Sequence, residues 1–384
     1  MKFKINSDII FVLILSIFII TLIILPGMNQ KKDYIYYKAE VVETINDEVF
    51  QYGLVKQGSQ NVSFRILNKD LKGEEFSVYN DLIGKMELDK FVQPGDKVLV
   101  ERFKNQFNDN FRIVDFYRFN SEILLFSIFA IILILISGWT GLKSLLSFMS
   151  TILVIWKIMI PMFLNGGNPV IIAFFIVSLL TFIIIFLVAG FNKKGFVAFI
   201  GAISGVLITV VLSLSFAKPF YINGAVKPFS ETLLYSGYAN LDLNLLFISG
   251  IFLASSGAVM DIAMDISASM YEVKMKKDDI STFDLMKSGL NVGRAVIGTM
   301  TTTLLLAYSG GFATLLMAFM AQGVNEMALL NINYISSEIL NIIVGSFGLV
   351  LTAPLTAFLG SIIINHEFIK ENKSLKSLFQ KEEL

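Results

Sequence analysis

The chain has 384 residues, of which 55% are hydrophobic, and its formal net charge is zero. Its mean hydropathy is +0.69, and several apolar runs exceed about 18 residues, the length that spans a bilayer as a helix. The composition therefore predicts a polytopic α-helical membrane protein. The chain has no cysteine and one histidine, which excludes disulfides, thiolate catalysis and the usual zinc and haem ligand sets. We expect no metal and no cofactor, and a balanced charge without a base-reading motif predicts no nucleic-acid partner.

Residues 1–27 form the first predicted segment. Lys2 and Lys4 precede an apolar run from Ile9 to Leu25, which ends at Pro26-Gly27. A cleaved signal peptide would need a small-x-small site after this run, and LPGMNQKK has none. The segment is therefore predicted to be an uncleaved transmembrane helix, and the chain that follows it is predicted to be exported.

Residues 28–118 are polar and are predicted to form a small extracytoplasmic all-β domain between the first two membrane helices. Four runs alternate between apolar and polar residues: Tyr37–Val42, Asn61–Leu67, Lys97–Phe103 and Phe111–Phe116. Alternation at period two, with turn signals such as Pro94-Gly95-Asp96 between runs, indicates half-buried antiparallel strands. A segment of this size suits an OB-like barrel or a sandwich.

Residues 119–366 are predicted to be a seven-helix membrane domain, followed by a cytoplasmic tail at 367–384. The apolar runs are Ile123–Ile136, Leu145–Leu164, Val170–Gly190, Phe196–Phe216, Leu245–Ala263, Ala295–Ala321 and Ile339–Ile364. With the first segment they make about eight membrane spans.

The positions of lysine and arginine orient these spans. If the N-terminus is inside, the inner connections and the tail hold Lys143, Lys193, Lys194, Lys274, Lys276, Lys277, Lys287, Arg294, Lys370, Lys373, Lys376 and Lys381. The membrane-proximal outer loops then hold only Lys218 and Lys227. The positive-inside rule therefore predicts that both termini are cytoplasmic and that the β-domain is outside.

The stretch Gly250–Met270 has the length of a membrane span, yet it carries Asp261 and Asp265 four residues apart on one helix face. Small residues continue that face, among them Gly257, so another helix can come close. Ionisable groups at membrane depth usually face a bundle interior or a wet cavity. We expect the two carboxylates to hold a proton or a cation, or alternatively to form a buried ion pair with Arg294.

The next span carries a stripe that begins at Arg294 and continues through Gly298, Thr299 and Thr302. Its hydroxyl groups either line a wet path or bond back to carbonyls of their own helix. Gly310-Gly311 near the middle of this span either breaks the helix, as in transporters, or serves helix packing. Before it, Ser281-x-x-Asp284 is a helix N-cap signal and predicts a short amphipathic helix on the inner surface.

The last span presents Asn341, Gly345, Gly348 and Thr352 on one face, followed by Pro354. This face is predicted to pack against the helix of Asp261, and the proline is expected to open the backbone. Earlier in the chain, Lys157 within an apolar run is expected either to snorkel to the outer headgroups or to pair with an acid inside the bundle.

Motifs that would support catalysis are missing from the sequence. There is no glycine-rich phosphate loop with its lysine, no Ser/His/Asp set and no HExxH. An ATP-driven pump or an intramembrane hydrolase would need such groups, so no enzymatic activity is expected.

Two long stretches, SGAVMDIAMDISASMYE (Ser256–Glu272) and SGLNVGRAVIGTMTTTLLLAYSGG (Ser288–Gly311), resemble the YibE/F family of bacterial membrane proteins. Shorter segments extend the resemblance from about Trp139 to Ile364, namely LNGGNP, GFNKKG, SGYANLD and GSFGLVLTAPLTA. The resemblance implies a multi-span protein of the bacterial cytoplasmic membrane with an extracytoplasmic N-terminal domain, and it brings no settled activity. Where the family's pattern often has an acid and an asparagine, this chain has Ala295 and Thr302, so Asp261 and Asp265 would have to supply any such acid.

Two functional hypotheses follow. The first is a secondary transporter or permease that moves an unknown ion or small solute, with Asp261 and Asp265 as binding groups and Arg294 as their counter-charge. Thr299, Thr302 and Asn341 would shape its path. The alternative is a non-transporting envelope scaffold or assembly protein whose β-domain binds a partner. Besides the lipid bilayer, the expected partners include an envelope protein or a second copy of the chain, because small-residue stripes also suit dimerisation.

Overall fold

The computed structural model describes residues 7–25, 34–103 and 111–379, with the side chains of residues 7, 8 and 366–379 left out. The chain divides into two compact units. One unit comprises Pro26–Ile136, and the other comprises Met1–Leu25 together with Ser137–Leu384. The predicted ends of the first span and of the tail, Pro26-Gly27 and residues 380–384, lie outside the described residues.

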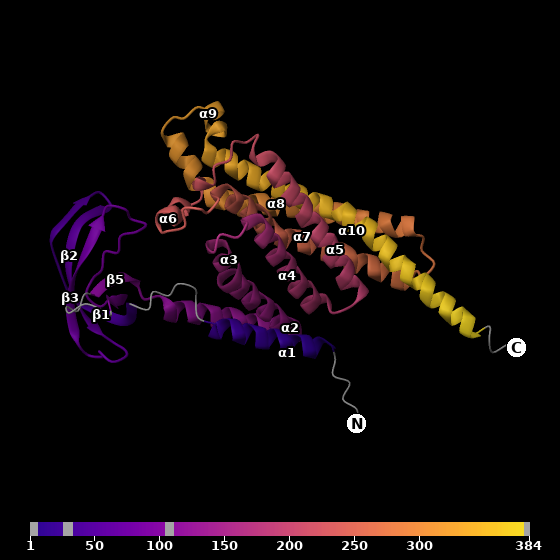
Figure 1. Cartoon of the computed structure of the whole chain (residues 1–384), viewed down its shortest axis with the longest axis horizontal. Coiled ribbons are helices and arrows are strands. Elements are labelled where there is room, and N and C mark those ends of the chain that lie inside the picture. Colours follow the sequence, from indigo (N-terminus) through magenta and orange to yellow (C-terminus); the bar gives the residue numbers. More distant parts are fainter. Residues whose placement is uncertain (1–6, 26–33, 104–110, 380–384) are drawn as a thin grey trace, which may run out of the picture. The chain divides into compact units, whose positions relative to one another are not determined.

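The smaller unit contains one antiparallel sheet (Figure 1). Its strand order is β3-β2-β1-β4-β5. Its strands are β1 (Tyr34–Tyr52), β2 (Val55–Ile66), β3 (Glu75–Ile83), β4 (Lys97–Phe103) and β5 (Phe111–Phe116). The four predicted runs fall in β1, β2, β4 and β5. Strand β3 was not predicted because only Asn80 and Leu82 on it are buried, so the hydrophobic alternation is weak.

The sheet curls into a half-barrel around its own core. The long central strand β1 pairs with β2 and β4, and its register shifts twice along β2, which increases the local twist. As a result the outer strands β3 and β5 approach each other, and the ring centroids of Phe76 and Phe111 lie 4.4 Å apart. Tyr37, Phe64 and Val100 lie in the core between them, each fully buried.

The other elements are helices, with α2 shared across the boundary of the two units. They are α1 (Ser7–Ile24), α2 (Phe119–Val154), the π-helix η1 (Ile155–Met159), α3 (Ile160–Leu164), α4 (Pro169–Ala189), α5 (Lys193–Ala217), the 3-10 helix η2 (Gly224–Val226), α6 (Ser230–Tyr235), α7 (Leu243–Lys276), α8 (Thr282–Ala321), α9 (Glu326–Asn331) and α10 (Asn333–Phe379). Among the described residues, six helices are long and apolar enough to cross a membrane, and α1 is a shorter apolar helix.

Several of these helices begin where the sequence supplies a side-chain cap. Asn168 accepts hydrogen bonds from two backbone N–H groups of α4, and Asp242 does the same for α7. Asn192, Ser281 and Asn325 cap α5, α8 and α9 in the same manner. Such caps satisfy N–H groups that the first turn leaves unpaired.

Two predicted spans, Ile123–Ile136 and Leu145–Leu164, lie in one helical run of 46 residues. Gly138 interrupts this run between them, with φ 53° and ψ −127°. Glycine tolerates this conformation because it has no Cβ. The run is therefore two helical segments joined at a kink, with a π-helical turn further on at Ile155–Met159.

The centre of the larger unit is formed by α5, α7 and α10, which lie side by side (Figure 1). Between α5 and α10, glycines of each helix lie opposite threonines of the other. A Cβ added to Gly205 would lie 1.8 Å from Thr352 Oγ1, and one added to Gly348 would lie 1.9 Å from Thr209 Oγ1. Small residues permit such close backbone approach, which drives helix association in lipid.

These contacts correct part of the predicted packing. Gly348 and Thr352 of α10 meet Thr209 and Gly205 of α5, whereas Gly345 approaches Ser255 of α7. Pro354 is exposed and α10 continues through it, so the predicted opening of the helix is not seen. Helix α8 also runs unbroken through Gly310 and Gly311.

The connection between α7 and α8 is short and comprises residues 277–281. Ser281 does act as an N-cap, since its Oγ accepts a hydrogen bond from the Asp284 N–H at 3.1 Å. The helix that it caps, however, is α8 itself. The prediction of a separate short amphipathic helix is wrong because its residues form the first turns of a 40-residue helix.

Lys157 binds the end of another helix. Its Nζ donates to the Leu25 carbonyl at 3.0 Å, just after α1. A cation at a helix C-terminus satisfies an unpaired carbonyl and complements the helix dipole. In the described part of the chain this lysine has no acidic partner, contrary to one of its two predicted roles.

The contact between α5 and α10 is testable by adding one methyl group. We expect Gly205→Ala to destabilise the protein by about 1–3 kcal/mol because its Cβ would overlap Thr352. Thermal unfolding of the purified protein in detergent measures this effect, and the pair Gly205→Ala with Thr352→Ala should recover part of it. Gly257→Ala is the matched control, since among the described residues no atom outside its own stretch of helix lies within 4 Å of its Cβ position. An unchanged melting temperature for Gly205→Ala would contradict the close packing.

Candidate functional site

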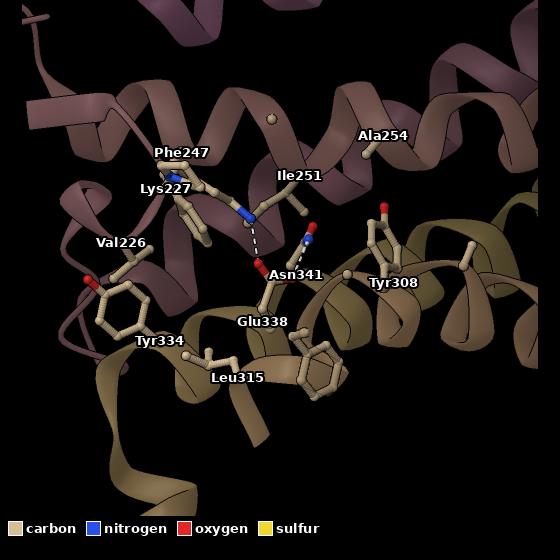
Figure 2. A pocket seen from close by; sticks show the side chains of 15 residues that line it. Val226, Lys227, Phe247, Ile251, Ala254, Tyr308, Leu315, Tyr334, Glu338 and Asn341 are labelled. Atoms are coloured by element: carbon tan, nitrogen blue, oxygen red, sulfur yellow. Dashed lines mark hydrogen bonds and ion pairs between the residues drawn. The ribbon is translucent and has the colours of Figure 1, made fainter. Parts of the chain in front are cut away.

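A cavity of about 570 Å³ lies between α7, α8, α10 and the loop that holds η2 (Figure 2). We call it the α7–α8–α10 cavity. Its lining residues are Val226, Lys227, Pro228, Phe247, Gly250, Ile251, Ala254, Ala307, Tyr308, Gly311, Phe312, Leu315, Tyr334, Glu338 and Asn341. A cleft of this size with a mostly apolar wall and a few polar groups is typical of small-molecule sites.

The polar groups of this cavity converge on Glu338. Its Oε1 pairs with Lys227 Nζ at 2.5 Å, and its Oε2 accepts a hydrogen bond from Asn341 Nδ2 at 3.1 Å. Figure 2 shows the lysine and the glutamate pointing toward one another from the loop and from α10. The ammonium group of Lys227 also lies 5.4 Å from the centroid of the Phe247 ring, a cation–π distance.

The loop is anchored so that Lys227 reaches the cavity. The N–H of Gly224 donates to Asn244 Oδ1 at 2.7 Å, and a Cβ at Gly224 would lie 1.8 Å from the Leu243 carbonyl oxygen. Only glycine therefore fits against the start of α7. Ser230 Oγ further along donates to the Lys227 carbonyl at 2.6 Å, which holds the lysine between η2 and α6.

Two polar atoms of the cavity residues have no hydrogen-bond partner in the described part of the chain. These are the Oδ1 of Asn341, whose side chain is 6% exposed, and the Oη of Tyr308. An unsatisfied buried polar group costs about 1–3 kcal/mol. Both atoms belong to residues that line the cavity.

The predicted acids lie elsewhere on α7. Asp261 and Asp265 are exposed, and neither is among the residues that line the cavity. In the described part of the chain neither forms an ion pair with Arg294, which is also exposed. The expected buried pair is therefore wrong, and the carboxylates do not point into the interior of a single copy.

The acids nevertheless share a helix face with the cavity wall. Gly250, Ala254, Gly257, Asp261 and Asp265 follow one another at intervals of four, three, four and four residues, and all five are exposed. That spacing keeps them on one side of α7. At 1.5 Å per residue, Asp261 lies about 10 Å beyond Ala254 along the helix. The stripe predicted from the sequence thus begins in the cavity and continues toward the acids.

The threonines of α8 bond back to carbonyls of their own helix, which is the second of the two roles predicted for them. Thr299 Oγ1 donates to the Val296 carbonyl at 3.0 Å, and Thr302 Oγ1 donates to the Gly298 carbonyl at 3.2 Å. Both hydroxyls are thus satisfied by their own helix. Thr301 differs, because its buried Oγ1 has no partner, and it lies seven residues before Tyr308 on the same face.

Among the predicted glycines, Gly311 lines the cavity, while Gly257, Gly298, Gly310 and Gly311 all have open space at the Cβ position. Asn341 is the one predicted binding residue that lies in the cavity. Sequence reasoning missed Glu338, Lys227 and Tyr308 as site residues. Glu338 stands one residue before the apolar run of the last span and one helical turn before Asn341, a spacing that could have drawn attention to it.

We expect the ion pair between Lys227 and Glu338 to stabilise the folded protein. Because Lys227 is 44% exposed and Glu338 is 20% exposed, solvent screens the pair, and we expect a coupling of about 0.2–1 kcal/mol. Lys227→Met should lower the melting temperature, and adding Glu338→Gln should restore it because no buried charge is then left unpaired. A double-mutant cycle measures the coupling, with the exposed Lys218→Met as control. Additive effects of the two substitutions would rule out the pair.

Comparisons with known proteins bear on the membrane part. The family model described as YibE/F-like protein matches residues 125–366, more than half of the chain. Searches of curated proteins and of solved structures found no match. The matched region contains the α7 stripe, the cavity and the acids described above. The chain belongs to the YibE/F-like family.

Proposed function

We propose that this protein is a secondary transporter or permease for an ion or small solute, and that the α7–α8–α10 cavity is its binding site. The observation that supports this is the cavity itself, which combines an ion pair, two unpaired polar atoms and an apolar wall. Transporters commonly place such groups between helices at membrane depth.

The second support is the stripe on α7. It connects the cavity wall at Gly250 and Ala254 with the two carboxylates at Asp261 and Asp265. In this proposal the cavity binds the solute, and the carboxylates carry a coupling proton or cation, because oxygen ligands suit both.

The proposal includes a topology. The six long apolar helices, with the first run divided at Gly138 and α1 added, provide eight segments. The positive-inside rule then places both termini in the cytoplasm of a bacterium and the β-domain outside its cytoplasmic membrane. The β-domain is proposed to be a partly open OB-like barrel, which its curled five-stranded sheet and the approach of β3 to β5 support.

Because the chain has no native cysteine, single cysteines can map this topology. We expect a membrane-impermeant maleimide to label Tyr52→Cys and Tyr221→Cys in intact bacterial cells, since both positions are exposed on segments placed outside. Asp279→Cys, between α7 and α8, should react only after the membrane is permeabilised. The reverse pattern would invert the orientation.

Charge movement in liposomes tests transport. Jumps of pH, Na⁺ and K⁺ are applied in turn while transient currents are recorded for the full-length protein. We expect a current in the wild type that is lost in Glu338→Gln and in the double variant Asp261→Asn with Asp265→Asn. Lys218→Met, which alters an exposed outer lysine, should behave as the wild type.

One observation favours the alternative, an assembly protein. Asp261, Asp265 and Arg294 are exposed without a partner in the described chain, and α8 has only Leu285, Gly289, Gly293 and Leu304 buried. These groups are complementary in charge, so a second copy or an envelope partner could cover them. Absence of current from folded protein, together with a dimer mass in detergent that falls to a monomer mass in the aspartate double variant, would support assembly over transport.

A further inference from the structure

The hydrogen bond from Asn341 to Glu338 leaves one buried acceptor of this cavity residue without a partner among the described residues. Its Nδ2 donates to the Glu338 carboxylate at 3.1 Å, and a carboxylate can only accept. The Oδ1 of the same amide must therefore point away from that bond, and it has no partner. Since the residue is 6% exposed, water does not satisfy it freely. A ligand at this position has to bring a hydrogen-bond donor.

The charges of the cavity sum to zero. Lys227 contributes one positive charge and Glu338 one negative charge, and the two are paired. A ligand with a single charge would leave the filled cavity with an unbalanced charge, which is costly away from water. A ligand with one charge of each sign can exchange partners with the existing pair and keep the balance.

The cavity also has room for an apolar group. Phe247, Ile251, Phe312 and Leu315 line it, and these side chains offer a surface for an aliphatic or aromatic body. Tyr308 adds a hydroxyl group without a partner, which can donate to a carboxylate.

We propose that the α7–α8–α10 cavity binds a small zwitterion with a primary ammonium group, a carboxylate and an apolar body, of the kind that an apolar amino acid provides. The ammonium group donates to Glu338 and to Asn341 Oδ1. The carboxylate replaces Glu338 as the partner of Lys227, which lies on a loop. It also accepts a hydrogen bond from the Tyr308 hydroxyl (Figure 2). This inference rests on the proposed transport function and names its substrate class.

Three probes with the same ring separate the charge requirements. Phenylalanine carries both charges, phenethylamine only the ammonium group, and 3-phenylpropionate only the carboxylate. Isothermal titration with the full-length protein in detergent should show binding of phenylalanine, with the other two at least about tenfold weaker because each leaves one charge of the site without its new partner. Equal binding of either single-charge probe, or no binding of phenylalanine to the folded protein, would overturn the zwitterion proposal.

Variants locate the site. Asn341→Leu and Tyr308→Phe should each weaken phenylalanine binding by about tenfold, the effect of losing roughly 1.4 kcal/mol of hydrogen bonding. Asn365→Leu is a matched control for the first, because Asn365 is also a buried asparagine of α10 with an unpaired Oδ1, and it is not among the residues that line the cavity. The Tyr308→Phe variant keeps the ring, so it tests the site even if Asn341→Leu fails to fold. Unchanged affinity in folded Tyr308→Phe and folded Asn341→Leu would place the ligand elsewhere and overturn the proposal.

Uptake of radiolabelled phenylalanine into liposomes separates this inference from the proposed function. Binding in the cavity without uptake would keep the zwitterion site and overturn transport. Ion currents without phenylalanine binding would keep transport and overturn the zwitterion. Binding and uptake that are both lost in Glu338→Gln would support the two together.

Discussion

The close approach of α5 and α10 is the contact on which the membrane unit depends. Lipid tails are as apolar as leucine side chains, so helices in a bilayer associate chiefly through close packing and hydrogen bonds. Gly205 and Gly348 provide room for Thr352 and Thr209 on the facing helices. Asn341 lies on the same face of α10 as Gly348, two helical turns nearer the start of the helix. There it lines the cavity together with Glu338.

The cavity contrasts with the tight interface beside it. At the interface, threonine hydroxyls bond back to their own helix, as Thr352 does to the Gly348 carbonyl, so no polar group is left open. In the cavity, Asn341 and Tyr308 each keep an atom without a partner. Buried polar groups in proteins are nearly always paired, and an exception in a space that can hold a ligand is most simply explained by binding. The paired charges of Lys227 and Glu338 cancel, so the cavity favours a ligand whose own charges also cancel. This balance of charge leads to the zwitterion proposal.

The sequence predicted some of these features for the right physical reason and missed others for equally clear reasons. Apolar runs located the long helices, because the length and period of an apolar segment are local properties. The acids of α7 were expected in the interior, but Asp261 and Asp265 are exposed. A small-residue stripe shows that a face can accept a close neighbour, and it does not say whether the neighbour belongs to the same copy. Glu338 was missed because it lies at the edge of an apolar run, where a charged residue is ordinary.

The sequence by itself determined the class of the protein, its long apolar helices, four of its five strands and the family resemblance, since these depend on composition, periodicity and motifs. It also placed Asp261, Asp265 and the small residues on one face of α7, because helical geometry is regular. Only the tertiary structure decided which faces meet. It brought Lys227 from a loop to Glu338 on α10, 111 positions later in the chain, and it left Arg294 apart from the acids. Such contacts depend on how α5, α7, α8 and α10 pack together, and no local pattern encodes that packing.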